Sequence, residues 1–538
     1  MLTNWFAQPA GARSSTDELR SADGDDDTSV MEADQGNVLS HIISQLRPGA
    51  DLSRVVLPTF ILEPRSMLER ITNFMCHPEM LLHIPEIDDP VERFVSVVKF
   101  YLSGWHIRPP GVKKPLNPIL GEIFTCYWDF DDNKRAYYIS EQTSHHPPKS
   151  SYFYLAPDHH IRIDGTLKPR SRFLGNSAAS LMDGIAFLTL LNRGKDPARG
   201  EQYILTQPNM YARGILFGKM KYELGDHSFV RCPELDLVAD VDFKTKGWVG
   251  GTYNAIGGTI KRESTGEILF ELSGLWSEEM FIKNLTTGQR EMFFNATQAK
   301  PNSPLVRPIE EQEERESQRL WENTAKAVKE RNHELATDEK TKIEDRQREE
   351  AALRAQDTVE WHPRLFRRVN GGPGGLEEGE EDLEWVINAT IDNSATPNKQ
   401  AEQVMAIFPI VKGQKPNTRH VIPPHNSSIV VDKQLGHVDE QAAVEAPKET
   451  KAAETKVEET KIGEVKLQNE KPEDNLIEFY ATPPSQPAQP PTKPEAVKPT
   501  PSQVEIQNLL NSTGKPADGP LIDFATDLEK DLPSVAKQ

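Results

Sequence analysis

The feature that most constrains the fold of this chain is a long series of short strand patterns between residues 124 and 274. The clearest is 235–243, where apolar and polar residues alternate and only Val238 departs from the pattern. Other strand patterns are found at 161–167, 202–206 and 268–273. Parallel strands need long crossover connections, usually helices, and no helical pattern of that length lies between these segments. The sequence therefore predicts an antiparallel sheet.

Two groups of glycines fall inside this region, at 247–251 and at Gly257 and Gly258. A phosphate-binding glycine loop opens a helix, and neither group is followed by a helical pattern. We therefore expect both groups to form bends between strands.

Helical patterns flank the predicted sheet. Apolar residues recur at helical spacing over 67–75 and again from about Pro90. The densely charged stretch 309–355 is also predicted to be helical, and short ordered segments are expected near 385–387 and 405–409. The sequence thus predicts an α+β protein whose C-terminal part is helical.

The ends of the chain have the composition of disordered segments. Residues 1–30 are polar and rich in aspartate, and the chain beyond about 426 consists mainly of Glu, Lys, Thr, Pro and Ala. The whole chain of 538 residues has 37% hydrophobic residues and a mean hydropathy of -0.58, which agrees with partial disorder.

The net charge of -20 argues against nucleic acid as a partner, because binding to phosphate backbones requires clustered cations. A local basic rim could still meet a membrane. The three cysteines cannot all pair, which favours a reducing compartment. With no signal-peptide pattern at residues 1–6 and no membrane-spanning apolar run, we expect a soluble cytoplasmic protein.

The octapeptide 141–148 carries two adjacent histidines, His145 and His146, followed by two prolines. Proline cannot continue a sheet ladder, so we expect a stiff turn that brings both imidazoles to one rim, where they could donate hydrogen bonds to an anion. A metal site is an alternative, although no spacing of Cys, His or Asp elsewhere completes a ligand set. A tight corner capped by polar residues is the other alternative.

Two further segments could meet an anion. Prolines fix the loop 113–118, which carries two ammonium groups, including that of Lys114, and the amide of Asn117. An ordinary solvated basic loop is the alternative explanation. In the helical stretch 340–348, three charged residues are spaced by four and share one helix face. These are Lys340, Glu344 and Arg348. A surface ladder of ion pairs would have the same spacing.

Together the octapeptide, the segment 114–118 and the segment 340–348 resemble the three ordered motifs of the oxysterol-binding protein family. The resemblance implies an incomplete antiparallel β-barrel around a lipid tunnel, with an N-terminal lid helix. It also implies that the motifs bind the head group of phosphatidylinositol 4-phosphate at the tunnel mouth. The implied phosphate ligands are Lys114, Asn117, His145, His146, Lys340 and Arg348, with Glu344 orienting its neighbours.

The extent of the resemblance sets the expected domains. A disordered acidic N-terminus at 1–33 precedes a lipid-transfer domain at 34–425, and a disordered tail occupies 426–538. Within the domain we expect the lid at about 34–56, the barrel at about 110–300 and the helical C-terminal part at about 305–425.

The segments 57–63 and 168–176 resemble the branch of the family that carries phosphatidylserine. On that resemblance Leu57, Thr59 and Ser171 would line a phosphatidylserine site, because a hydroxyl can satisfy a buried serine head group. A sterol/phosphatidylinositol 4-phosphate exchanger with the same rim residues is the closest rival. A lipid sensor or scaffold at a membrane contact site is the second rival. No nucleophile accompanies the histidines, so we expect neither an enzyme nor a cofactor.

Five apolar residues at helical spacing precede the turn at Pro48 and define the expected lid. They are Val38, Leu39, Ile42, Ile43 and Leu46. Simple packing of this helix on the core is the alternative to a movable lid. Transient contact with anionic membranes at junctions of the endoplasmic reticulum and the plasma membrane would follow from the resemblance. The segment 478–482 loosely resembles an acidic motif read by endoplasmic-reticulum receptors, which suggests a protein partner for the tail.

Overall fold

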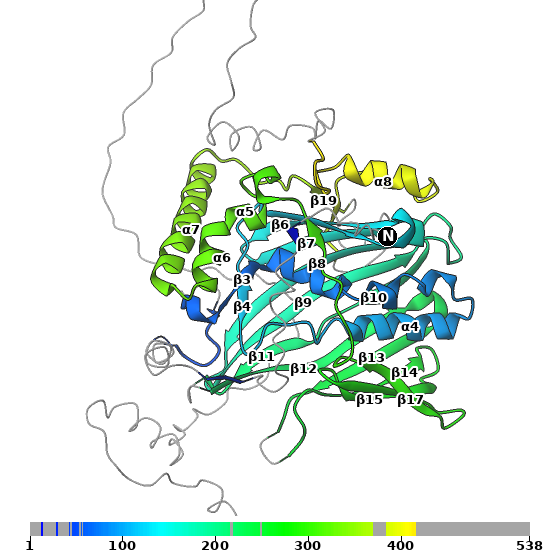
Figure 1. Cartoon of the computed structure of the whole chain (residues 1–538). Helices are drawn as coiled ribbons and strands as arrows, with labels where there is room; N and C mark the ends of the chain where they lie inside the picture. Colours follow the sequence, from blue (N-terminus) through cyan, green and yellow to red (C-terminus); the bar gives the residue numbers. More distant parts are fainter. Residues whose placement is uncertain are drawn as a thin grey trace, which may run out of the picture. The chain divides into compact units, whose positions relative to one another are not determined.

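The computed structural model describes residues 57–215, 219–247, 250–369 and 383–415, together with the short pieces 12–13, 28–30, 42, 46–52 and 55. All of them belong to one compact unit (Figure 1).

One large sheet dominates this unit. In the part of the chain that the structure describes, it has 16 strands, and all pairings within it are antiparallel, which confirms the predicted sheet type. The strands that form its main path are β5 (Ile123–Asp129), β6 (Arg135–His145), β7 (Pro148–Ala156), β8 (Ile161–Phe173), β9 (Ser177–Leu190), β10 (Glu201–Leu205), β12 (Lys219–Cys232), β13 (Leu237–Lys244), β14 (Ala255–Arg262), β15 (Ile268–Leu275), β16 (Glu279–Asn284) and β17 (Arg290–Asn295).

Four short strands complete the large sheet. They are β1 (Ala12–Arg13), β2 (Thr28–Val30), β11 (Asn209–Arg213) and β18 (Leu305–Val306). β11 pairs with both β9 and β12, and β18 pairs with β5. Among the described residues the path does not close from β17 back to β1, so the sheet is an open barrel.

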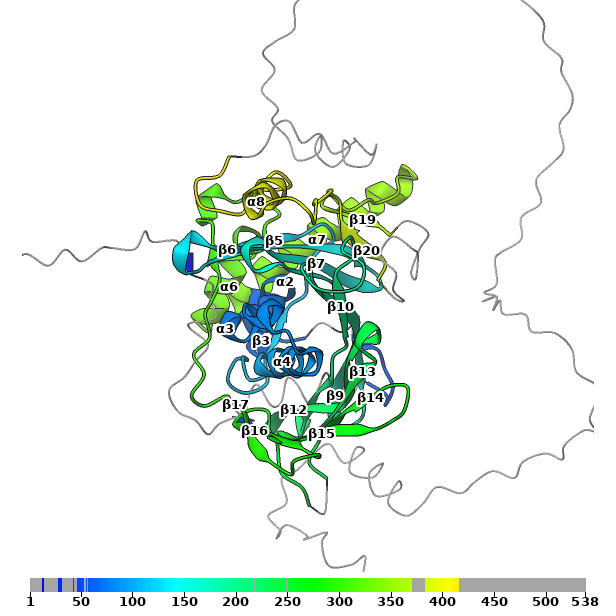
Figure 2. The same ribbon diagram turned by 90° about the vertical axis from the view of Figure 1, so that its right-hand side faces the viewer.

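The helices lie on both sides of this curved sheet. Among the described residues they are α2 (Met67–Arg70), α3 (Pro78–Leu81), α4 (Pro90–Ser103), α5 (Ser317–Leu320), α6 (Glu322–Lys329), α7 (His333–Gln356) and α8 (Pro397–Met405). Figure 2 shows α4 within the curve of the sheet. α4 begins where the sequence predicts, because the Asp89 carboxylate accepts hydrogen bonds from two backbone N–H groups of its first turn, at 2.9 and 2.8 Å.

Strands β5 to β7 are apolar on both faces, because each face is covered. Side chains such as Phe124 and Tyr138 join the inner core, in which α4 also packs. Their neighbours Ile139 and Phe153 face the other way and pack with the C-terminal segment that includes Phe408. The segments predicted near 385–387 and 405–409 are therefore ordered because they cover the outside of the barrel.

Two sequence predictions about strand limits are wrong in detail. β13 begins at Leu237, two residues later than predicted, because residues 233–235 form a 3-10 turn and Asp236 has a left-handed φ of 56°. Gly257 and Gly258 are not a bend between strands: they lie inside β14 and pair with β13. The sequence pattern missed this, because glycine has no side chain to contribute to strand alternation.

The position of Gly258 leads to a stability prediction. Its φ is +147°, and an added Cβ would lie 2.3 Å from the carbonyl oxygen of Asp240. We expect Gly258→Ala to lower the free energy of unfolding by at least about 2 kcal/mol, measured by urea denaturation. Gly250→Ala is the control, because its added methyl would meet no atom within 4 Å. Equal destabilisation by the two variants would contradict the prediction.

Candidate functional site

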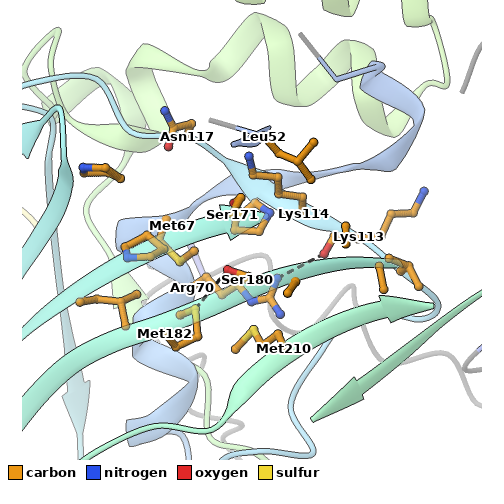
Figure 3. A pocket seen from close by; sticks show the side chains of 18 of the residues that line it. Leu52, Met67, Arg70, Lys113, Lys114, Asn117, Ser171, Ser180, Met182 and Met210 are labelled. Atoms are coloured by element: carbon orange, nitrogen blue, oxygen red, sulfur yellow. Dashed lines mark hydrogen bonds between the residues drawn. The ribbon is translucent and has the colours of Figure 1, made fainter. Parts of the chain in front are cut away.

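A cavity of about 260 Å³ opens between the inner face of the sheet and the segments that precede β5. Most of its wall is apolar. Figure 3 shows Met67, Met182 and Met210 along this wall, with Lys114 and Asn117 farther along the cavity. A flexible, apolar methionine surface adapts to ligands of variable shape, and such a wall suits a hydrocarbon chain.

The end of β8 shows how strand alternation builds the wall. Pro169, Ser171 and Phe173 line the cavity, as alternate residues of a strand on one face must. Arg170 lies on the opposite face and forms an ion pair with Asp183 of β9. The serine hydroxyl is therefore presented to the cavity from an otherwise cationic segment.

A small parallel sheet carries the basic loop to the cavity. β3 (Leu62–Ser66) pairs with β4 (Lys114–Leu116), and Lys113, Lys114 and Asn117 all line the cavity. The Lys113 ammonium donates a hydrogen bond of 2.7 Å to the Phe60 carbonyl oxygen. Burial lowers the pKa of Lys114, and the neighbouring Lys340 charge adds to the effect while Glu344 opposes it. A partly buried ammonium held beside another cation favours the arrival of an anion.

His145 and His146 lie at the turn between β6 and β7, and both line the cavity. Their ring centroids are 4.4 Å apart. Burial, with a smaller effect of His146, lowers the pKa of His145 to about 4, so that this imidazole is neutral at pH 7. The expectation that neither proline continues the ladder is wrong for Pro148, which opens β7 opposite His145. The first residue of a strand tolerates proline.

The third charged segment lies on α7, as its spacing predicts. Lys340 and Glu344 form an ion pair of 2.6 Å, and both act on the pKa of Lys114, which places this part of α7 beside the basic loop. Arg348 turns away: its side chain is 62% exposed and pairs with Asp345. None of the three is among the residues that line the cavity.

The residues expected to hold phosphatidylserine are not equivalent in the structure. Leu57 and Ser171 line the cavity. Thr59 is buried and does not line it; its hydroxyl donates a hydrogen bond of 3.1 Å to the carbonyl oxygen of His333, the first residue of α7. The Thr59 hydroxyl therefore attaches the segment that precedes β3 to the first residue of α7.

Of the five expected lid residues, the structure describes Ile42 and Leu46, and both line the cavity. Val38, Leu39 and Ile43 lie outside the described residues, as does the tail segment 478–482. The described piece that follows Leu46 is attached to the end of β8 by two backbone hydrogen bonds, from Gly49 N to Phe173 O at 2.7 Å and from Phe173 N to Ala50 O at 2.9 Å.

Sequence reasoning missed three polar residues of this region. Arg70 lines the cavity and donates a hydrogen bond to the Lys113 carbonyl oxygen at 3.4 Å. Gln207 lines it as well, with a buried amide oxygen for which the described residues offer no hydrogen bond. Gln347, on α7, contacts His145. No local pattern marks Arg70 or Gln207. Gln347 falls inside the segment 340–348, where the sequence prediction rested only on the charged residues.

Within the described part of the chain, no cluster of three His, Cys, Asp or Glu side chains has an arrangement that could hold a metal ion. No helix described by the structure has both the length and the apolar character that crossing a membrane requires.

An apolar cavity inside an open antiparallel barrel, bordered by partly buried cations and a histidine pair, defines the class of protein: it is a lipid-binding β-barrel protein. The family model described as oxysterol-binding protein matches residues 41–329 and 324–395. The Osh1 ORD domain in complex with cholesterol has a similar fold, with a TM-score of 0.54 and 21% identity over 68% of this chain and 88% of that one.

Relatives in sequence are much closer. An oxysterol-binding protein-like protein of Candida albicans, OBPalpha, is 51% identical over 394 residues, which cover 73% of this chain and 90% of that protein. Oxysterol-binding protein homolog 6 of Saccharomyces cerevisiae is 48% identical over 400 residues, covering 74% of this chain and 87% of that protein. The chain belongs to the oxysterol-binding protein family.

Proposed function

We propose that this protein extracts phosphatidylserine from one membrane and exchanges it for phosphatidylinositol 4-phosphate from another. The observation that carries the proposal is the lining of one cavity, where Lys114, Asn117, His145 and His146 border an apolar wall. The wall would hold acyl chains, at about 0.8 kcal/mol for each buried CH2 group, and the polar border would hold a phosphorylated head group.

The electrostatics of the border support an anionic ligand. The pKa of Lys113 is lowered by burial and by Arg331, and that of Lys114 by burial and by Lys340. A phosphate placed among these cations would raise the pKa of both lysines again, because an opposite charge stabilises the ammonium form. We assign Lys340 to the same head group, with Glu344 orienting it. Arg348 would join them only after leaving Asp345.

For phosphatidylserine we assign the contacts to Leu57 and Ser171, which line the cavity. Thr59 would have to release the carbonyl of His333 before its hydroxyl could reach a lipid. We further propose that residues 34–425 form the transfer unit, and that it works in the cytoplasm at contacts between the endoplasmic reticulum and the plasma membrane. In that setting it touches anionic membranes transiently, and the tail segment 478–482 binds a protein partner.

A sterol is the alternative second ligand, and one observation favours it. Gln207 lines the cavity, and its buried amide oxygen accepts no hydrogen bond from the described residues. That oxygen could accept a hydrogen bond from a sterol hydroxyl. The residues at the border would act on phosphatidylinositol 4-phosphate in the same way in either exchanger.

The test uses transfer between liposomes, with fluorescent sensors for phosphatidylserine, phosphatidylinositol 4-phosphate and sterol. We expect Ser171→Ala to slow phosphatidylserine transfer about tenfold, the loss of one buried hydrogen bond of about 1.4 kcal/mol, and to leave phosphatidylinositol 4-phosphate extraction within about twofold. Ser180→Ala is the matched control, because Ser180 lines the same cavity but its hydroxyl bonds to the Met182 sulfur at 3.3 Å.

Three results would revise this proposal. Sterol transfer without phosphatidylserine transfer would replace the second ligand. Binding of lipid without net transfer would make the protein a sensor. An equal effect of Ser171→Ala and Ser180→Ala would remove the head-group role from Ser171.

A further inference from the structure

Gln347 is an unusual residue of α7. Of the 24 residues of this helix, the buried ones are Ala336 and Gln347, and Gln347 is only 8% exposed. Both polar atoms of its side chain have partners on other segments of the chain. A buried amide that is held at both ends has one orientation, and that orientation determines what its neighbours can donate or accept.

The orientation of the amide follows from Leu120. The backbone N–H of Leu120 donates a hydrogen bond of 2.7 Å to Gln347 Oε1. The amide NH2 must therefore face the other partner, His145 Nε2, at 3.1 Å. An amide nitrogen can only donate, so Nε2 of His145 is the acceptor and carries no hydrogen. The neutral imidazole then carries its hydrogen on Nδ1.

The surroundings of His145 agree with a neutral ring. Burial and the neighbouring His146 lower the pKa of His145 to about 4, far below the usual value for histidine. His146 is the titratable group in ring contact with it. Lys340 and Glu344, the charged groups of α7 that act on the pKa of Lys114, are paired with each other. At pH 7 the His145 ring is therefore neutral, and the contact with Gln347 selects one of its two tautomers.

The same amide joins the three segments that border the cavity. Leu120 follows Asn117 by three residues, His145 ends β6, and Gln347 lies between Glu344 and Arg348 on α7. We propose that Gln347 is a positioning residue, which fixes His145 as the Nδ1–H tautomer at the cavity and holds α7 in register with the loop at Leu120. The role of this tautomer in holding phosphate rests on the proposed function; the tautomer itself does not.

The experiment compares the full-length wild type with Gln347→Ala and Gln347→Glu. Selective 15N labelling of histidine and two-bond 1H–15N spectra report which ring nitrogen carries the hydrogen, and His145→Ala assigns the signal. In Gln347→Glu, one carboxylate oxygen would accept from Leu120 N–H and the other would face Nε2, so we expect the hydrogen on Nε2. Gln347→Ala should lose the preference for Nδ1–H. Gln356→Glu makes the same chemical change at an exposed position of α7 and should alter nothing.

Binding to liposomes that contain phosphatidylinositol 4-phosphate is the second readout. We expect both Gln347 variants to bind about tenfold more weakly, and Gln356→Glu to bind like the wild type. A wild-type His145 with its hydrogen on Nε2, or a tautomer that both variants leave unchanged, would overturn the proposal. If the wild type does not bind the lipid but the tautomer changes as expected, the proposed function fails and the positioning role stands.

Discussion

The full-length variant with both His145→Ala and His146→Ala should bind phosphatidylinositol 4-phosphate at least about 100-fold more weakly than the wild type. Each imidazole would donate one hydrogen bond to a charged phosphate, and such bonds contribute about 1.5–3 kcal/mol, so the pair accounts for a loss of about 3–6 kcal/mol. Because both rings line the cavity at its border, their removal leaves the apolar wall intact. Flotation with liposomes of defined composition measures the change.

The matched control is the double variant His83→Ala and His227→Ala, which removes two exposed histidines. It should bind the lipid like the wild type. The measurement should be made with phosphatidylserine as well, where we expect a smaller loss, since Leu57 and Ser171 remain. Wild-type binding of phosphatidylinositol 4-phosphate by the first variant would contradict the assignment of the histidine pair to the head group.

The second large effect concerns stability and is expected for Glu122→Ala. The Glu122 side chain is buried at the entry to β5 and accepts hydrogen bonds from four donors on three segments. The donors are the hydroxyls of Ser66 and Ser317, the backbone N–H of Ile119 and the indole N–H of Trp321. Removing the carboxylate takes the acceptor from the buried donors of Ser66, Ile119 and Trp321, whereas the Ser317 hydroxyl keeps the Ile123 carbonyl oxygen at 3.2 Å. We expect a loss of about 3–5 kcal/mol in the free energy of unfolding.

Burial raises the pKa of Glu122, while the four hydrogen bonds oppose this effect. Glu122→Gln should be milder, at about 1 kcal/mol, because its amide oxygen can accept from Ile119 and Trp321 while its NH2 donates to the two serine hydroxyls. Glu349→Ala, at an exposed position of α7, is the control. Urea denaturation of the three variants decides: equal midpoints for Glu122→Ala and the wild type would show that this carboxylate does not anchor the barrel to α5.

The two predictions concern one arrangement. Glu122 fixes the loop that leads from Asn117 to β5 against α5 and Trp321. Trp321 in turn packs in a small cluster with Leu116 of β4 and Ile343 of α7. The basic loop and α7 are therefore held together by apolar packing around Trp321, which the Glu122 carboxylate fixes, and by the hydrogen bond from Leu120 to Gln347. Cations that repel one another can be kept close in this way, because the surrounding structure determines their separation.

Much of the fold could be predicted from local patterns. The strand predicted at 235–243 appears with its limits shifted by two residues or fewer, and the helix predicted from about Pro90 begins at Pro90. The start of β13 was misplaced because of a local turn at 233–236, whereas the placement of Gly258 depends on a contact with another strand. Gly258 lies in a strand that packs closely against the backbone of Asp240. No residue pattern within β14 indicates this close approach.

The same distinction holds for the site. The octapeptide with His145 and His146, the loop around Lys114 and the charged face of α7 can each be read from the sequence as a candidate for binding anions. The roles of single residues could not be predicted in this way. Arg348 shares the helical spacing of Lys340 but is exposed and paired with Asp345. The Thr59 hydroxyl donates its hydrogen bond to the carbonyl oxygen of His333.

The sequence by itself determined the antiparallel strands, the helices that flank them and the three candidate segments, because these depend on the chemistry of neighbouring residues. Only the tertiary structure decided that Lys114, His145 and Ser171 border one cavity and that Gln347 reaches His145 across 202 positions of the chain. The physical reason is that convergence depends on how the sheet curves and how its helices pack. Both result from many weak contacts between distant residues, and no short pattern records them.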